Sequence, residues 1–212
     1  VVAVTRRPAG RRDLLARQWP VEGVVGENGA LAYFEADGKL NRFYHPDVAQ
    51  GDPQARLEEI RNVVLKEIPG SRVAKDQFAR LFDLAIDFCE EPPDLGLEVA
   101  QEIAAIFKRM GAKAKVSSIH VNGWFGDYDK LAMVKLFTQE HWGIALEEHK
   151  NEFIFCGDSP NDEPMFAYFP NSCGVANIRD FEETMKNLPH FVTDKRGGAG
   201  FCQLAERILS LR

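Results

Sequence analysis

The sequence predicts an α/β fold in which a parallel-sheet core carries an inserted α+β domain. Both ends of the chain alternate short apolar runs with amphipathic stretches, the βαβ rhythm that produces parallel strands joined by right-handed crossovers. The middle of the chain instead shows a hairpin pattern followed by several helical periods. We therefore expect residues 1–30 and 121–212 to form the core and residues 31–120 to form the insert.

The first core segment has the clearest pattern. Two apolar runs of strand length, residues 1–5 and 21–27, flank an amphipathic stretch with the length of a short helix. Residues 30–43 then alternate around Asp37-Gly38, which is a strong signal for a two-residue hairpin turn. We assign this hairpin to the insert because the βαβ rhythm stops before it.

The remaining elements follow from the same periodicities. In the insert, helices are expected near 53–67, 75–90 and 94–110, and a strand at 115–121. The second core segment is expected to contain a helix at 127–141, a strand at 152–157, a helix after 162, a strand at 172–176 and a final helix near 201–211. The run Gly197-Gly198-Ala199-Gly200 predicts a turn before that last helix.

Composition narrows the class of protein. A net charge of −6 argues against a general nucleic-acid binder, and no apolar stretch is long enough to span a bilayer. The four cysteines are scattered without a CxxC pair, which fits reduced thiols in a cytoplasmic protein. Because residue 1 is a valine that already lies in an apolar strand pattern, we expect the chain to be a fragment that begins inside a fold.

The run Phe-Ile-Phe-Cys-Gly-Asp-Ser-Pro-Asn-Asp at 153–162 is the most informative motif. It predicts a strand that ends in a turn carrying Asp158 and Asp162, and ligands of open α/β sheets bind at such strand ends. Two carboxylates four residues apart on one turn are able to approach a single Mg²⁺. The structural alternative is that Asp158 closes an Asx-turn and Asp162 caps the next helix.

Two further residues have the chemistry of an anion site. Thr5 ends the first strand before a helix, where a hydroxyl and free N–H groups favour an anion; the alternative is a helix N-cap. Lys130 falls in the first turn of a helix that Asp127 is expected to cap. A cation there is unfavourable unless an anion lies nearby, which is either a bound phosphate or a carboxylate of Asp127, Asp129 or the strand-end aspartates. The structural alternative is a solvent-facing lysine paired with Asp127. Arg6 and Arg7 are candidate phosphate ligands or a solvated basic surface.

In this order, the motifs resemble those of the haloacid dehalogenase (HAD) superfamily of phosphatases, specifically members with a C2B-type cap, and sugar-phosphate phosphatases look nearest. Val1-Val-Ala-Val-Thr5-Arg-Arg-Pro is similar to the second motif of that family, and Asp129-Lys130 to the third. Gly157-Asp-Ser-Pro-Asn-Asp162 is very close to the fourth motif, and Gly26-Glu-Asn-Gly-Ala30 resembles the junction between core and cap. The resemblance covers nearly the whole chain and implies a Rossmann-like HAD core with an inserted cap.

The resemblance also implies a function and a set of roles. The expected activity is Mg²⁺-dependent hydrolysis of a small phosphate ester through an aspartyl-phosphate intermediate. This fragment alone is expected to be inactive. Thr5 and Lys130 would be catalytic residues that stabilise the transferring phosphoryl group. Asp158 and Asp162 would hold Mg²⁺. The residues expected to contact substrate are Arg7, Asn28 and Asn161.

Two departures from the family pattern matter. The family usually has glycine where Arg6 stands, and the first motif, an Asp-x-Asp that supplies nucleophile and acid/base, is missing. We expect that motif upstream of Val1, because Asp127-Tyr-Asp129 lacks a preceding apolar strand. A non-catalytic phosphate-binding protein and a phosphomutase of the same fold remain alternative functions.

Overall fold

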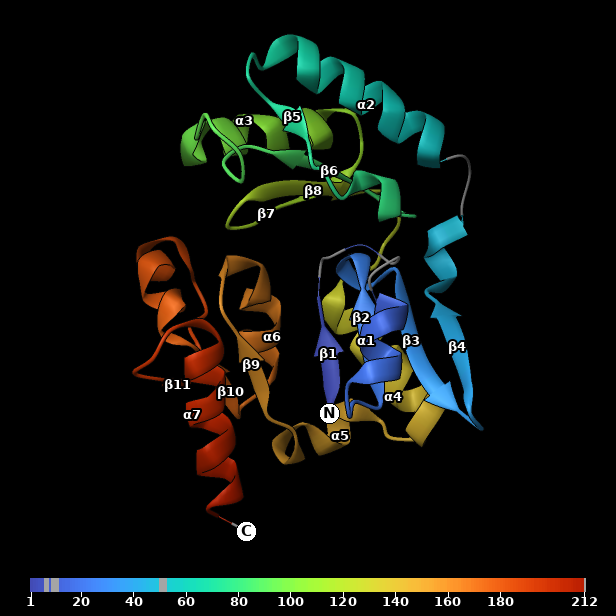
Figure 1. Ribbon diagram of the computed structural model, residues 1–212, viewed down its shortest axis with the longest axis vertical. Helices are drawn as coiled ribbons and strands as arrows, with labels where there is room; N and C mark the ends of the chain where they lie inside the picture. Colours follow the sequence, from blue (N-terminus) through green and yellow to red (C-terminus); the bar gives the residue numbers. More distant parts are fainter. Residues whose placement is uncertain (6–7, 9–11, 50–52, 212) are drawn as a thin grey trace. The chain divides into compact units, whose positions relative to one another are not determined.

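The structure, a computed structural model, describes residues 1–5, 8, 12–49 and 53–211. It divides into two compact units, Val1–Trp142 and Gly143–Arg212. In the described residues, the first unit contains two four-stranded sheets and the second contains one three-stranded sheet (Figure 1). No helix within these residues is long and apolar enough to cross a membrane.

The first sheet has the order β1-β2-β3-β4, and β1 runs parallel to β2 as the βαβ pattern predicts. Its strands are β1 (Val2–Val4), β2 (Gly23–Gly26), β3 (Leu31–Ala36) and β4 (Lys39–Tyr44). The predicted hairpin is confirmed, with positive φ angles at Asp37 and Gly38. Its assignment to the insert is wrong, because β3 pairs antiparallel with β2 and extends the core sheet. The short turn Glu27–Gly29 reverses the chain at once, so the apolar start of β3 is buried beside β2.

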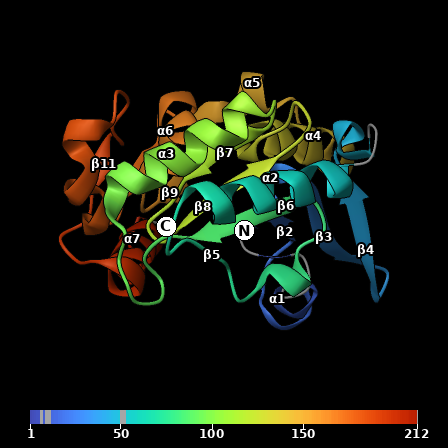
Figure 2. The same ribbon diagram turned by 90° about the horizontal axis from the view of Figure 1, so that it is seen from above.

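Helices α1 (Arg12–Gln18) and α4 (Lys130–Trp142) both pack on this sheet, on opposite faces (Figure 2). Side chains alternate between the faces of a strand, so Tyr33 packs in the cluster of Ala16 on α1 while Phe34 contacts Phe137 on α4. Gly23 lies under the Phe137 ring, where a Cβ would be 2.7 Å from its Cζ atom. The sheet is therefore covered on both sides.

The second sheet has the antiparallel order β5-β6-β8-β7. Its strands are β5 (Arg72–Val73), β6 (Asp83–Asp87), β7 (Lys113–Val116) and β8 (His120–Trp124). Helices α2 (Pro53–Glu67) and α3 (Gly96–Arg109), both close to their predicted ranges, cover its apolar face (Figure 1). We refer to this α+β layer, residues 53–124, as the cap.

Two predictions within the cap are wrong. Residues 75–90 form the 3-10 turn η4 (Gln77–Ala79) and strand β6 instead of a helix, because Leu84 and Ile86 lie on one face of β6 and pack in the apolar cluster of α2 and α3. The single strand expected at 115–121 is instead the end of β7, a turn at 117–119 and the start of β8. The Ser117 hydroxyl makes this turn by accepting the His120 N–H at 2.7 Å and donating to the His120 carbonyl at 2.6 Å.

The second unit has a parallel sheet with the strand order β11-β10-β9, and the sequence predicts two of its strands, at 152–157 and 172–176. It comprises β9 (Phe155–Gly157), β10 (Ser172–Gly174), β11 (Phe191–Val192), α5 (Leu146–His149), α6 (Glu163–Tyr168) and α7 (Gly197–Leu209). The described residues also contain the 3-10 turns η3 (Pro46–Ala49), η5 (Lys150–Glu152), η6 (Pro160–Asp162) and η7 (Ala176–Thr184). That the second unit and residues 1–30 share one core stays a prediction.

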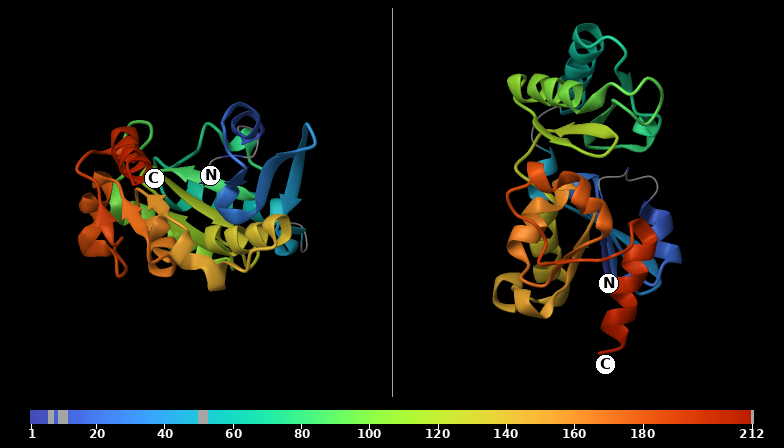
Figure 3. Two further views of the ribbon diagram at one scale, coloured as in Figure 1. Left: turned by 90° about the horizontal axis from the view of Figure 1, so that it is seen from below. Right: turned by 90° about the vertical axis from the view of Figure 1, so that its left-hand side faces the viewer.

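The glycine run at 197–200 is the first turn of α7 and not a separate loop (Figure 3). The Asn177 side-chain oxygen accepts the Gly197 N–H at 2.7 Å and so holds the start of the helix. Gly200 lies against the chain, since a Cβ there would be 2.2 Å from the Lys195 carbonyl oxygen. The glycines thus serve close packing within a helix, which a turn signal alone does not distinguish.

Candidate functional site

Thr5 lies at the carboxyl end of β1, where the sequence predicts it. Its N–H donates to the Val25 carbonyl at 2.9 Å, so the pairing between β1 and β2 continues one residue beyond the strand. The side chain is half-buried. Because ligands of α/β sheets bind at this edge, Thr5 is well placed to meet an anion. The expected substrate residue Arg7, like Arg6, lies outside the described residues.

The turn that follows β2 brings a second element to this edge. Gly29 has a φ of +103°, and a Cβ on it would be 2.1 Å from the Asp129 carbonyl oxygen and 3.0 Å from the Lys130 nitrogen. Only glycine permits so close an approach of two backbones. The turn therefore packs directly on the start of α4, and Lys130 is the first residue of that helix.

The cap of helix α4 is Asp129, and the expectation that Asp127 caps it is wrong. The Asp129 carboxylate accepts the Ala132 N–H at 2.8 Å, three residues on, as an N-cap does. Asp127 is almost fully exposed and accepts a hydrogen bond from Lys113 at 2.6 Å, which lowers the pKa of its carboxyl. Lys130 is half-buried at the first helical position, where the helix dipole favours a bound anion beside it.

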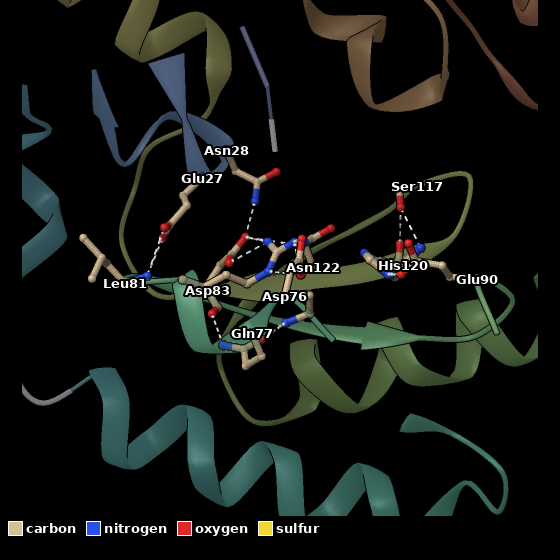
Figure 4. A network of polar contacts seen from close by, with 12 residues as sticks. Glu27, Asn28, Asp76, Gln77, Leu81, Asp83, Glu90, Ser117, His120 and Asn122 are labelled. Atoms are coloured by element: carbon tan, nitrogen blue, oxygen red, sulfur yellow. Dashed lines mark hydrogen bonds and ion pairs between the residues drawn. The ribbon is translucent and has the colours of Figure 1, made fainter. Parts of the chain in front are cut away.

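Asn28 is buried, and its amide is used inside the protein. Its Nδ2 donates to the Asp83 carboxylate at 2.8 Å, which links the core turn to the cap (Figure 4). Its proposed contact with substrate stays a prediction.

The sequence reading missed the residues around Asn28. Asp83 also accepts from Asn122 at 3.1 Å and from the Arg80 guanidinium at 2.9 and 3.1 Å (Figure 4). Burial raises the pKa of Asp83, and the Arg80 charge and the Asn122 amide oppose that rise. Buried Glu27 also belongs to this group. Arg80, three residues before Asp83, was the available local signal. The other partners of Asp83 are Asn28 and Asn122, which lie 55 and 39 residues away in sequence.

In the second unit, the turn after β9 carries the predicted carboxylates in different environments. Asp158 is exposed, whereas Asp162 is buried and accepts the Asp158 N–H through Oδ2 at 3.1 Å. Ser159 donates to Asp158 Oδ1 at 3.1 Å, and Asn161 donates to Ser159. Asp162 makes no side-chain cap to α6. Its carboxylate holds the turn, and Asp158 presents its carboxylate to solvent.

Gly157 makes this arrangement possible. A Cβ at this position would be 2.7 Å from Asp162 Oδ2 and 2.9 Å from the Phe166 ring. The glycine therefore leaves room for the Asp162 side chain to fold back against the end of β9. The Gly-Asp-x-x-x-Asp spacing of the motif has a direct physical cause.

The donor chemistry of this turn fits Mg²⁺ as part of a ligand set. Asp158, Asp162 and Asn161 offer oxygen atoms, which this cation prefers, and Mg²⁺ usually takes one or two carboxylates together with water and phosphate oxygens. Within the ranges that the structure describes, no group of three or more His, Cys, Asp or Glu side chains has the geometry of a metal site. The turn by itself therefore offers part of a Mg²⁺ ligand set.

Comparison with solved structures identifies the fold. Across 98% of this chain and 81% of the other, it matches protein 0175 of Thermoplasma acidophilum, with a TM-score of 0.68 and 20% identity. It also matches the HAD subclass IIB sugar phosphatase BT4131 over 98% and 84% of the chains, with a TM-score of 0.64 and 12% identity. The sucrose-phosphatase of Synechocystis sp. PCC6803, solved with sucrose and phosphate, matches over 97% and 83%, with a TM-score of 0.64 and 13% identity.

No family model matches the sequence, and no curated protein is significantly similar to it. The structural matches nevertheless extend over nearly the whole chain. The chain has the mixed α/β fold of the HAD subclass IIB phosphatases, which confirms the resemblance read from its motifs. At these identities, the likeness establishes the fold and leaves the reaction to the site.

Proposed function

We propose that the protein is a Mg²⁺-dependent phosphohydrolase that acts on a small phosphorylated metabolite, most simply a sugar phosphate. The observation that carries this proposal is the close packing of Gly29 on the Asp129–Lys130 peptide. This packing brings the half-buried Lys130 to the edge of the sheet where β1 ends at Thr5. A hydroxyl and an ammonium at such an edge suit a phosphoryl group. The printed names of the sugar phosphatases that share the fold support the substrate class.

Each residue has a role in this proposal. The Thr5 hydroxyl donates to a phosphoryl oxygen, and the Lys130 ammonium offsets the charge on the phosphoryl group. Asp158 ligates Mg²⁺ through its exposed carboxylate, and Asp162 fixes the turn and contributes directly or through water. Asn161, Asn28 and Arg7 would contact the substrate. When bound, Mg²⁺ neutralises charge on the transferring phosphoryl group.

The nucleophile of this proposal is an aspartate on a strand that precedes Val1. Its carboxylate attacks phosphorus, the ester oxygen leaves with a proton from a neighbouring acid, and water then hydrolyses the acyl phosphate to regenerate the aspartate. Two observations support this location. Asp127 and Asp129 are used in a surface ion pair and a helix cap. In the part of the chain that the structure describes, β1 is an edge strand with β2 as its one strand partner.

The test compares this chain with a longer chain that includes its upstream segment, both assayed with Mg²⁺ against sugar phosphates and an aryl phosphate. We expect hydrolysis by the longer chain and a loss of at least tenfold in Lys130→Gln. Lys150→Gln, which removes a partly exposed lysine paired with Glu147, is the matched control and should retain activity. Wild-type turnover in Lys130→Gln would refute the assignment.

The same assay separates the two rivals. Asp127 forms a surface ion pair and Asp129 caps a helix, which favours a non-catalytic phosphate-binding protein. Such a protein would bind inorganic phosphate without hydrolysing any ester. A phosphomutase would return the phosphoryl group to the sugar, so product analysis would find a sugar-phosphate isomer. A cytoplasmic location stays a prediction.

A further inference from the structure

The turn between β2 and β3 has an unusual backbone. Its three residues all have positive φ angles: 43° at Glu27, 58° at Asn28 and 103° at Gly29. This region is disfavoured for residues with a Cβ, so two of the three persist only because surrounding contacts hold them. All three are buried. We call Glu27, Asn28 and Gly29 the latch turn.

The first two residues of the latch turn bind the cap. The Glu27 carboxylate accepts the N–H of Leu81 at 2.9 and 3.0 Å and the N–H of Phe82 at 2.7 Å (Figure 4). Asn28 donates to Asp83, the next residue of the cap, at 2.8 Å. Hydrogen bonds to charged groups are stronger than those between neutral groups. Three consecutive cap residues are therefore bound by two residues of the core.

The cap holds its side of the contact in place. Arg80 Nη1 donates to both carboxylate oxygens of Asp83, and Arg80 also pairs with Asp76; all of these groups are largely or wholly buried. The Gln77 amide donates to the Asp83 carbonyl at 2.9 Å. Because the Asp83 carboxylate has fixed partners within the cap, Asn28 meets an acceptor whose position is set by the cap.

The third residue of the latch turn contacts the opposite element. Gly29 packs on the peptide between Asp129 and Lys130, and the carbonyl of Val25, just before the turn, accepts the Thr5 N–H. A Cβ at Gly29 would overlap the Asp129 carbonyl, so the two backbones are in direct contact. We therefore expect a change in the latch turn to move the first turn of α4.

We propose that the latch turn couples the position of the cap to the phosphate-binding residues. Glu27 and Asp83 are positioning residues that act on Lys130 through the turn, and the inference rests on the proposed function for what Lys130 binds. While residues 81–83 remain bound, the turn keeps its strained conformation and α4 keeps its packing. When the cap moves away, the turn relaxes and the first turn of α4 loses its support.

The test is amide hydrogen exchange on the variant Glu27→Gln, which keeps one acceptor oxygen but loses the negative charge and the second oxygen. We expect exchange to be several-fold faster at Leu81 and Phe82, because their bonds to a charged carboxylate are replaced by bonds to a neutral amide. The coupling predicts a second, smaller acceleration at Ala132 and Met133, whose N–H groups bond to Asp129. Acceleration confined to 81 and 82 would overturn the inference.

Two further variants keep the test decisive. Glu90→Gln, which alters the His120 contact elsewhere in the cap, should leave exchange at 132 and 133 unchanged. Asn28→Gly removes only the bond to Asp83 while allowing the positive φ, so it should fold and still accelerate exchange at 132 and 133. If Glu27→Gln does not fold, Asn28→Gly alone decides: unchanged exchange at 132 and 133 refutes the coupling.

Inorganic phosphate with Mg²⁺ separates this inference from the proposed function. Phosphate that binds through Lys130 should slow exchange at Leu81 and Phe82, and its affinity should fall several-fold in Glu27→Gln. Binding without that protection would overturn the coupling and leave the proposed function intact. Failure of phosphate to bind, with coupled exchange in the variants, would support the coupling and count against the proposed function.

Discussion

Replacing Gly29 by alanine should destabilise the first unit far more than the same change at Gly38. Both glycines have a positive φ, 103° and 69°, so both variants suffer a backbone penalty of roughly 1–2 kcal/mol. Both also gain about 0.4–1 kcal/mol because alanine restricts the unfolded chain. These two effects largely cancel when the two variants are compared.

The difference between the variants comes from packing. A Cβ at Gly38 has no heavy atom within 4 Å, whereas a Cβ at Gly29 would be 2.1 Å from the Asp129 carbonyl oxygen. That neighbour is backbone at the start of a helix and cannot rotate away. Overpacking in a buried site costs about 1–3 kcal/mol. We therefore expect the free energy of unfolding of Gly29→Ala to fall below that of Gly38→Ala by about 1–3 kcal/mol.

Urea denaturation followed by tryptophan fluorescence measures this difference. All three tryptophans, Trp19, Trp124 and Trp142, lie in the first unit, so the signal reports on its unfolding. Gly29→Ala should also weaken phosphate binding, because it displaces the peptide that carries Lys130. Equal midpoints for the two variants would refute the tight contact between the latch turn and α4, and with it the coupling inferred above.

Three other predictions concern different parts of the chain. In an active longer chain, Asp158→Asn should reduce Mg²⁺-dependent turnover at least tenfold while Asp127→Asn does not; equal activity would remove Asp158 from the metal site. His141 packs among aromatic rings, and its burial lowers its pKa, although the charge of a nearby glutamate opposes this shift. Because its pKa is lower in the folded state, the unfolded state binds the His141 proton more readily. Stability should thus fall as pH drops below about 6.5, and a phenylalanine at this position should flatten that dependence in pH-resolved thermal melts. Burial raises the pKa of Cys156 to about 12, so thiol reagents should label the exposed Cys202 much faster than Cys156. Faster labelling of Cys156 would contradict its raised pKa.

Local sequence signals were sufficient for the parts of the fold that depend on local chemistry. The Asp37-Gly38 turn, the parallel strands and the turn that holds Asp158 and Asp162 all follow from residue types at short spacing. The motif at Gly157 could be recognised from the sequence because one turn contains both the glycine and Asp162, whose carboxylate occupies the place of a Cβ at position 157. The HAD-type fold was therefore accessible through a few short motifs.

The errors arise where distant residues decide the outcome. Residues 83–87 have charges that suit a helix surface, but pairing with β8 makes them a buried strand. The hairpin was assigned to the insert because nothing local says which sheet it joins; the reversal at the latch turn decides that. The helix cap was placed two residues early because Asp127 and Asp129 are equally good caps in sequence, and the Lys113 ion pair separates them.

The buried charges between core and cap raise the question of what they contribute. A buried ion pair such as Arg80–Asp83 is often no more stable than apolar side chains of similar size, because desolvation offsets the attraction. Stability alone therefore gives no reason to place three buried charged groups, Glu27, Arg80 and Asp83, beside the half-buried Asp76 at one contact. Directional bonds do fix one arrangement of the cap relative to the turn, and that is the property the coupling requires. The double variant Arg80→Met with Asp83→Leu tests this distinction. We expect its free energy of unfolding to lie within about 2 kcal/mol of wild type. We also expect hydrogen exchange of the α4 amides to respond less to changes at Leu81. A variant that stays coupled would mean that the Glu27 carboxylate alone transmits the position of the cap.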